Sequence, residues 1–511
     1  MTNFSLDTIQ QDFKIHDSYQ IEIKLDYSLI ENKNSQYQVH TYFFIPYSLG
    51  INSSRYSSEE ISSNILNYIR LRTPQYNFDE FLVNDSSPIA VIEKLIDSPD
   101  WRKNVEINNQ IIEQLKLLGA MLKTAIRDHI DLIHQRLLES PTDTAAAHYL
   151  ESLIKNYSKG ASKVCKAYRK LLRSFNTANI SSELFQAYQI TDEFISTQFE
   201  EGAVDIYQML DEYFKNEDQA NLVQEFQKGL RDLALAEIDH REAMGYRSIL
   251  QKNGHNEVYV YLLSALKKVT ADVLHLKISE QKEGVLLEQI GFAIAAGMAM
   301  LFATIVAFYF QANYGSLTFP VFIALVVGYM FKDRLKELMR EWISGALVGK
   351  FFDQRIIIRK EGKRQKLGTI KKKVFFSKYD RVPKKVRRKR EEAIIDILDD
   401  EFAGESVLCH AREINLRANA FQGIFSSSLP VSGINDIIRI DIRFLLNRMD
   451  EPVDTRYVLG EDGLHSVKVR RVYYVYVVSK YKSISPYKET LYILHRVVLS
   501  RKGIVRVEHL D

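Results

Sequence analysis

The sequence is poor in the residues on which several common kinds of protein depend. Its 511 residues include 2 cysteines, Cys165 and Cys409, and 10 prolines. Two cysteines cannot build a disulfide framework or a site made of several thiolates, so the soluble parts are expected to face a reducing compartment. With 46% apolar and 26% charged residues, the chain is neither disordered nor fibrous. Its length allows about three or four domains.

The chain also lacks the short motifs that mark common phosphate-binding and catalytic sites. It contains no G-x-x-x-x-G-K-[ST], G-x-G-x-x-G, G-x-S-x-G, H-E-x-x-H or C-x-x-C. Carboxylate and imidazole stand three residues apart at Glu237 and His240, and again at Asp131 and His134, which is the spacing of di-iron bundles. Such a centre needs further inward carboxylates, and the charged neighbours of His240 suggest a solvated face. A surface salt bridge is therefore the preferred interpretation, and no metal, cofactor or catalytic residue is assigned.

One stretch of the chain has no charge at all. Residues 289–331 are 43 consecutive residues without Asp, Glu, Lys or Arg. As one helix they would be roughly 65 Å long, about twice the ~30 Å core of a bilayer, whereas two helices with a tight turn fit. We therefore expect a two-helix transmembrane hairpin with helices over 289–310 and 317–331. The alternative, a hairpin buried in a soluble domain, would usually show a charge where it meets the surface.

Small residues recur at every fourth position of both expected helices. Such ridges let two backbones approach closely in lipid, where the hydrophobic effect does not drive helices together. Packing of the two ridges on each other is preferred over pairing with a second copy of the chain, although a homo-oligomer stays open. The predicted packing residues are Gly291, Ala295, Ala299, Ala303 and Ala307 in the first helix, and Pro320, Ala324 and Gly328 in the second.

Cations flank the expected hairpin but are absent from its turn. Lys277 and Lys282 precede the first helix, Lys332 and Arg334 follow the second, and residues 311–316 contain neither Lys nor Arg. Because cytoplasmic segments carry an excess of Lys and Arg, both long arms and both termini are expected on the cytoplasmic side. The expected location is the cytoplasmic (inner) membrane.

Downstream of the hairpin the chain becomes strongly basic. Residues 350–390 hold 18 Lys and Arg against 3 acidic residues. An amphipathic helix that carries Trp342, followed by these cations, favours contact with anionic lipids, where each cation is worth ~1 kcal/mol. A nucleic-acid patch is the minor alternative, and a solvated linker that only enforces topology is the other. The predicted membrane-surface residues are Trp342, Lys371, Lys372, Lys373, Lys384, Lys385, Arg387, Arg388, Lys389 and Arg390.

Helical periodicity fills the middle of the chain, and alternating β-branched and aromatic residues fill its ends. Helices are expected over 182–214 and 218–244, and strands over 19–31, 37–46, 467–480, 490–499 and 504–508, while 437–449 suits either. The expected domains are an N-terminal α+β segment (1–100), a cytoplasmic helical bundle or arm (101–285), the hairpin (286–331), an amphipathic and polybasic juxtamembrane segment (332–398), and a C-terminal α+β domain (399–511).

The fold class expected from these patterns is an α+β multidomain integral membrane protein. It would combine a helical bundle arm, a two-helix transmembrane hairpin and small terminal domains with antiparallel sheets. The strands over 19–31 and 37–46 flank a short polar turn and are expected to form a β-hairpin. Because a membrane hairpin returns the chain to its starting side, this N-terminal β-hairpin could pair with the C-terminal strands in one sheet.

The function expected is that of a membrane-anchored cytoplasmic scaffold, sensor or interaction protein with an unidentified protein partner. An oligomeric pore-forming or signalling effector is the first alternative. An enzyme with an unfamiliar site in the C-terminal domain is the second, to be recognised by polar residues that converge in one pocket. His410 follows Cys409, but adjacent residues usually diverge in space, so this pair is not taken as a catalytic thiol and base.

Overall fold

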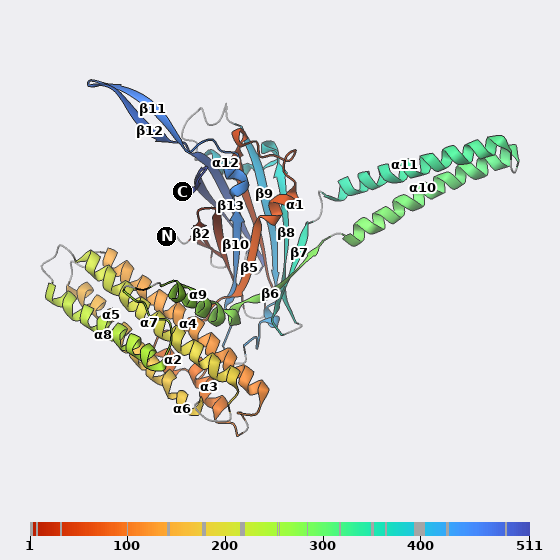
Figure 1. Ribbon diagram of the computed structural model, residues 1–511. Coiled ribbons are helices and arrows are strands. Elements are labelled where there is room, and N and C mark those ends of the chain that lie inside the picture. The colour runs from red at the N-terminus through yellow and green to blue at the C-terminus, as the bar shows by residue number, and fades with distance from the viewer. Residues whose placement is uncertain are drawn as a thin grey trace.

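The computed structural model describes residues 4–6, 9–30, 33–99, 101–139, 144–175, 180–214, 220–252, 254, 256–283, 285–315, 318–348, 352–362, 365–392, 404–425, 429–485 and 488–510. These residues form a mixed helix and antiparallel sheet (α+β) structure with several sheets. A β-sandwich lies beside a helical bundle, and a helical hairpin and a β-ribbon project from the body in different directions (Figure 1).

Two antiparallel sheets make up the described part of the sandwich. The smaller sheet has the order β1-β2-β3-β10-β5, with β1 Phe4–Leu6, β2 Ile9–Asp17, β3 Gln20–Ser28, β10 Gly433–Asp441 and β5 Ile65–Leu71. The larger sheet has the order β15-β14-β13-β4-β9-β8-β7-β6. Its strands are β15 Gly503–Leu510, β14 Glu489–Ser500, β13 Tyr473–Ser485, β4 Ser35–Pro46, β9 Glu405–Leu416, β8 Lys366–Ser377, β7 Gln354–Lys360 and β6 Leu276–Lys282.

In each sheet one strand from one end of the chain is inserted between strands from the other part of the chain. In the smaller sheet β10 pairs with β3, so that Ile438 lies opposite Ile23. In the larger sheet β4 lies between β9 and β13, and Tyr42 is the partner of both Cys409 and Val478. The beginning and the end of the chain therefore build one sandwich together, with a shared apolar core between the sheets.

One buried ion pair joins the two sheets inside this core. Nη2 of Arg412 on β9 lies 2.7 Å from Oδ2 of Asp436 on β10, and both side chains are fully buried. Burial lowers the pKa of neighbouring His410 well below its ordinary value, and the cations of Arg412 and Lys372 lower it further. Removing one partner would leave a buried charge unpaired between the sheets, which is strongly destabilising.

The helical bundle fills the chain between β5 and β6. Its main helices are α3 Pro88–Ile96, α4 Val105–Leu138, α5 Thr144–Lys170, α7 Ser182–Tyr213, α8 Ala220–Met244 and α9 Glu257–Ala271. Ser181 caps α7 by accepting a hydrogen bond from the backbone N–H of Leu184, and α8 ends at Gly245, whose φ of 71° suits only a residue without Cβ. The helices expected over 182–214 and 218–244 are confirmed.

Three expectations about strands and their pairing were wrong. The basic segment expected over 332–398 contains strands β7 and β8 of the larger sheet. The strand expected over 467–480 is split, because β12 Gly463–Arg470 pairs with β11 Val453–Gly460 in a projecting ribbon before β13 begins. The strands expected over 19–31 and 37–46 do not form a β-hairpin, because β3 and β4 belong to different sheets. The run 437–449, which suited either a strand or a helix, contains both the end of β10 and the short helix α14 Arg443–Leu446.

Candidate functional site: an apolar helical hairpin

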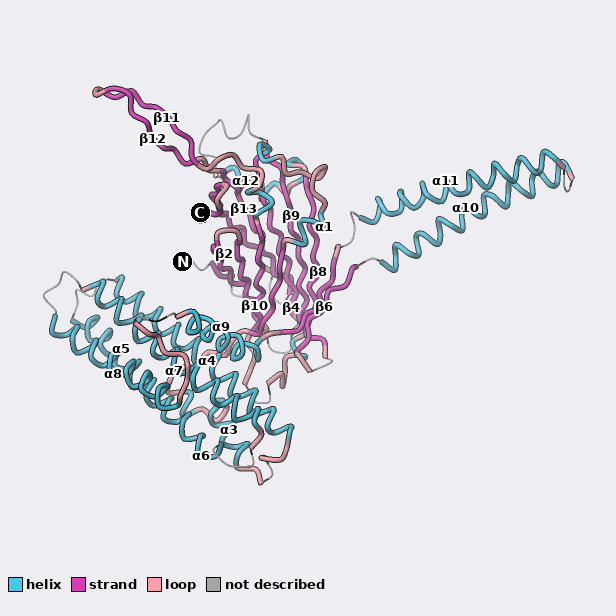
Figure 2. Tube along the Cα trace, in the orientation of Figure 1, coloured by secondary structure: helices cyan, strands magenta, loops and turns pink. Residues whose placement is uncertain are grey.

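The candidate site is a helical hairpin that leaves the edge of the larger sheet between two paired strands. Helix α10 Val285–Tyr314 follows β6, and helix α11 Phe319–Val348 precedes β7; each has 30 residues and is about 45 Å long. Figure 2 shows both helices extending away from the sandwich and the bundle. No amphipathic helix separate from the hairpin is seen in the described residues, because α11 continues through 332–348.

Hydrogen bonds and ion pairs tie both legs of the hairpin to the sheet. Strands β6 and β7 pair so that Lys282 lies opposite Gln354. The backbone N–H of Glu283 donates to the carbonyl oxygen of Asp353 over 3.2 Å. The Glu283 carboxylate accepts from Arg355 and lies 3.2 Å from Nζ of Lys371. The two legs therefore start from the same place on the body.

Small side chains line the contact between the two helices. Ala295 and Ala299 of α10 are buried, as are Ala324 and Gly328 of α11. A Cβ atom added at Gly328 would lie 3.6 Å from Cγ1 of Val306. Small residues at these positions let the helices approach closely.

The remaining predicted packing residues lie at the margins of this contact. A Cβ atom at half-buried Gly291 would come within 2.6 Å of Cγ2 of Ile343, so this position tolerates no side chain without a shift. Ala303 and Ala307 are half-buried, and Pro320 is exposed near the turn. The contact thus follows most of the predicted ridge on α10 and two of its three members on α11.

Large apolar side chains cover the outside of the hairpin. Helix α10 exposes its large residues while it buries alanines, which is the reverse of a helix in a water-soluble core. The exposed residues are Leu286, Ile290, Ile294, Met298, Met300, Leu301, Ile305 and Phe308 on α10, and Phe319, Phe322, Ile323, Leu325, Val326, Val327, Met330 and Phe331 on α11. Contiguous apolar surface on this scale marks an interaction surface rather than an ordinary protein surface.

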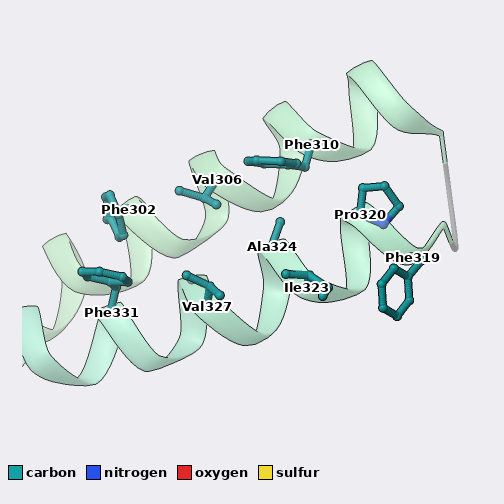
Figure 3. A pocket seen from close by; sticks show the side chains of 10 residues that line it. Phe302, Val306, Phe310, Phe319, Pro320, Ile323, Ala324, Val327 and Phe331 are labelled. Atoms are coloured by element: carbon teal, nitrogen blue, oxygen red, sulfur yellow. The ribbon is translucent and has the colours of Figure 1, made fainter.

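An apolar groove of about 570 Å³ lies between the helices near their turn. Phe302, Val306 and Phe310 of α10 face it from one side, and Pro320, Ile323 and Phe331 of α11 face it from the other (Figure 3). The groove offers an ion no polar side chain, so it does not favour a path through one hairpin.

Charge is distributed unequally along the two helices. The uncharged part of α10 runs to the end of the helix, whereas that of α11 covers residues 319–331, about 20 Å. Among the described residues, the part of α10 from Glu288 to Tyr314 is the one helix long and apolar enough to cross a membrane. On α11, Nζ of Lys332 lies 3.8 Å from the ring centre of Tyr329, and Arg340 lies over Phe292 of α10.

The predicted membrane-surface residues lie in three separate places. Trp342 on α11 is 72% exposed. Lys371 and Lys373 lie on the outer face of β8, but Lys372 points inward, is 4% exposed and forms an ion pair with Glu280 at 3.2 Å. A buried lysine of this kind cannot meet a lipid surface.

The second run of cations forms helix α12 Lys384–Glu391, which packs on β13 and β14. Arg390 is buried, forms an ion pair with Glu405 at 2.8 Å, and lies 3.5 Å from the ring centre of Tyr476. Four strand spacings separate β13 from β7, which is about 20 Å. The other members of this run, exposed Lys384, Lys385 and Arg388 and half-buried Arg387 and Lys389, therefore lie away from the root of the hairpin.

The charged residues around Glu237 do not form the solvated face that the sequence suggested. Glu237 and Arg241 are buried at 3% and 1% exposure. Arg169 of α5 lies between Glu237 and Asp192, at 2.6 Å and 3.3 Å, and Asp192 also contacts His240 at 2.8 Å. The guanidinium of Arg169 occupies the space between the two carboxylates that a metal ion would have to occupy. The network of ion pairs links α5, α7 and α8.

Cys409 and His410 point to opposite faces of β9. Cys409 belongs to the apolar cluster on the outer face, where burial raises the pKa of its thiol to about 12. His410 faces the interior between the sheets. A thiol and a base on opposite faces of a strand cannot exchange a proton directly.

Comparison of the chain with protein-family models, curated proteins and solved structures finds no match.

Proposed function

We propose that this protein is a membrane-anchored cytoplasmic scaffold or sensor, held by insertion of the α10–α11 hairpin into a lipid bilayer. The observation that carries the proposal is the inverted exposure of the hairpin, with large apolar side chains outside and alanines inside. Exposed apolar surface costs about 25 cal/mol per Å² in water, and a bilayer removes that cost. In lipid, close packing of small residues is what holds two helices together.

The pairing of β6 with β7 supports a hairpin whose two arms lie on one side of the bilayer. Because Lys282 and Gln354 are partners in a sheet, a chain that enters the membrane after β6 has to return before β7. The bundle and the sandwich would then share the compartment, where both are available to a protein partner.

The charge boundary on α11 supports an interface near Tyr329 and Lys332. An uncharged run of about 20 Å is shorter than a ~30 Å bilayer core, so the long cationic side chains after it must extend toward the near headgroups. Tyr309 and Tyr314 would lie at the far interface, where aromatic residues with a polar group are enriched. The proposed lipid contacts near the root are Trp342, Lys371 and Lys373, with anionic lipid as the preferred partner.

The first experiment compares two substitutions of exposed apolar residues. Ile305→Asp places a carboxylate on the outer face of α10, which costs about 2.5–3.5 kcal/mol at the centre of a bilayer. Leu235→Asp makes the same change on exposed α8 of the bundle. We expect Ile305→Asp to lower the fraction of full-length chain retained in the membrane pellet after alkaline carbonate, and Leu235→Asp to leave it unchanged. Release of the unmodified chain by carbonate would contradict the proposal.

Topology can be read with single introduced cysteines, because Cys165 and Cys409 are both buried. An impermeant thiol reagent applied to inside-out vesicles should label Lys252→Cys in the bundle and a second cysteine, Arg470→Cys, in the ribbon that projects from the sandwich. Asn313→Cys in the turn should stay unlabelled until the vesicles are opened. Labelling of the bundle and the sandwich from opposite sides would show that the chain does not form a hairpin.

A further inference from the structure

A polar cavity lies at one end of the sandwich, where four segments of the larger sheet begin or end. It has a volume of about 360 Å³ and is lined by residues at the start of β4, the start of β8, the end of β9 and the end of β13. This size falls in the range of pockets that hold small molecules. It is the kind of convergence of polar groups that an unfamiliar binding or catalytic site requires.

A row of polar side chains crosses three adjacent strands on the floor of this cavity. Asn415 of β9 is the register partner of Gln36 on β4 and of Thr369 on β8. Asn34 and Ser485 stand at the rim, where Oγ of Ser485 donates to the carbonyl oxygen of Asn34 over 3.2 Å. Amide and hydroxyl groups of this kind can donate to the oxygens of a ligand.

Two cations, Lys366 and Arg417, line the same cavity, and no carboxylate does so among the described residues. Neither cation forms an ion pair within the described part of the chain. The nearest acid along β9, Glu413, already accepts hydrogen bonds from Gln36 and Asn415, each at 3.2 Å. The cavity therefore holds positive charge that its own walls do not neutralise.

The cations around the cavity repel one another. Burial lowers the pKa of Lys366, and the positive charges of Arg417, Arg355 and Arg359 lower it further. An anion bound between Lys366 and Arg417 would reduce this repulsion, because its negative charge would compensate the two cations.

We infer that this cavity binds a phosphorylated small molecule, with its phosphate between Lys366 and Arg417. Arginine recognises phosphate through two parallel N–H groups, and lysine adds a compact charge. The volume exceeds what one phosphate fills, and the row Thr369, Asn415 and Gln36 is placed to bind the rest of the ligand. We name Lys366, Arg417, Thr369, Asn415 and Gln36 the phosphate site.

A phosphate group can belong to a soluble compound or to a lipid headgroup, and the position of the cavity favours the soluble compound. The cavity lies at the end of β7 opposite the hairpin root, about 20 Å away along the strand. The charged part of α11 adds distance between the sheet and the bilayer. The preference for a soluble compound over a lipid headgroup rests on the proposed membrane insertion. The phosphate site itself does not depend on that proposal.

The experiment is isothermal titration of the full-length chain in detergent micelles with inorganic phosphate and with adenosine 5′-monophosphate. The same chain is also mixed with phosphatidylcholine vesicles that contain or lack phosphatidylinositol phosphate. Lys366→Gln and Arg417→Gln each remove one cation of the site. Arg470→Gln, on the exposed ribbon β11–β12, is the matched control, and thermal unfolding of every variant checks that it folds.

We expect at least one soluble phosphate compound to bind and each site variant to weaken binding by about tenfold or more, with Arg470→Gln unchanged. Equal binding by all variants, or no binding of either soluble compound, would overturn the inference. Binding only to vesicles with phosphatidylinositol phosphate, lost in the site variants, would overturn the soluble source. The membrane-pellet and labelling experiments are unaffected by these outcomes, so the two proposals fail separately.

Discussion

Helices α4 and α10 are similar in length, with 34 and 30 residues, but they sort their side chains in opposite ways. Helix α4 buries Leu115 and Leu118 against the bundle, and the opposite side of the helix is polar. Helix α10 buries Ala295 and exposes Leu301. The bundle is organised by the removal of large apolar side chains from water, whereas the hairpin is organised by the close approach of two backbones. The two helices therefore depend on different kinds of residue for their contacts.

The comparison is tested most strongly by removing one leucine from each helix. Leu118→Ala, at a fully buried position of α4, should lower the free energy of unfolding by about 2–5 kcal/mol because it leaves a cavity. Leu301→Ala, at a position that is 61% exposed, should change it by less than about 0.5 kcal/mol in detergent. Urea unfolding of the purified chain measures both. A large cost at Leu301 in detergent would mean that this side chain packs inside the protein.

The second test enlarges small residues on the two sides of α10. Ala295→Leu should separate the hairpin helices at a cost of about 1–3 kcal/mol, since the position is fully buried. Gly297→Leu is the matched control, because an added Cβ there meets nothing within 4 Å.

The readout is a disulfide between the substitutions Val306→Cys and Gly328→Cys. A Cβ atom at Gly328 lies 3.9 Å from Cβ of Val306, which suits a disulfide. We expect Ala295→Leu to slow its formation and Gly297→Leu to leave it unchanged. The intramolecular contact is refuted if the disulfide forms between two chains in preference to one.

The third test is a dependence of stability on pH that arises in the sandwich and not in the hairpin. Burial, followed by the charge of His509, lowers the pKa of His495 to about 3, and Phe13 stacks on its ring at 4.3 Å. Between about pH 6.5 and about 3 the unfolded chain takes up a proton that the folded chain does not. The free energy of unfolding should therefore decrease by up to about 1.4 kcal/mol for each unit by which the pH is lowered in this range.

Urea unfolding at neutral and mildly acidic pH measures this slope, and His495→Gln should make it shallower. The charge-free part of the hairpin has no such group, so mild acid should loosen the sandwich before it releases the chain from membranes. An unchanged slope in His495→Gln would assign the acid sensitivity to other buried imidazoles, such as His410.

Much of the bundle could be predicted from sequence because its signals are local. The bounds of α7 and α8 follow from Ser181 as a cap, Gly245 as a stop and apolar residues at helical spacing between them. The mixed α+β class follows in the same way from helical periodicity in the middle and alternation at the ends.

Strand β8 was missed because its charges suggested a segment in contact with anionic lipid or a solvated linker. Ile370, Lys372 and Val374 form its inward face, and a lysine at the central position breaks the alternation that marks a strand. The ammonium of Lys372 is compensated by Glu280, which comes 92 residues earlier in the chain. An ion-pair partner so distant in the sequence cannot be recognised from the pattern of residues around Lys372.

The phosphate site could not be found from sequence for a related reason. Gln36 lies on β4, Lys366 on β8 and Arg417 directly after β9, and only the register of these strands brings them together. The charge-free run 289–331, by contrast, is a single uninterrupted signal. The position of the hairpin could therefore be predicted from the sequence alone, whereas the phosphate site could be recognised only from the strand pairing in the larger sheet.

The position of β4 between β9 and β13 also sets an order of events during synthesis. The larger sheet cannot close until β13 has left the ribosome, whereas α10 and α11 are complete much earlier. At ordinary rates of translation this interval is on the order of ten seconds. The apolar hairpin is thus exposed to chaperones before the larger sheet can form, so the proposed insertion into lipid would precede completion of the sandwich.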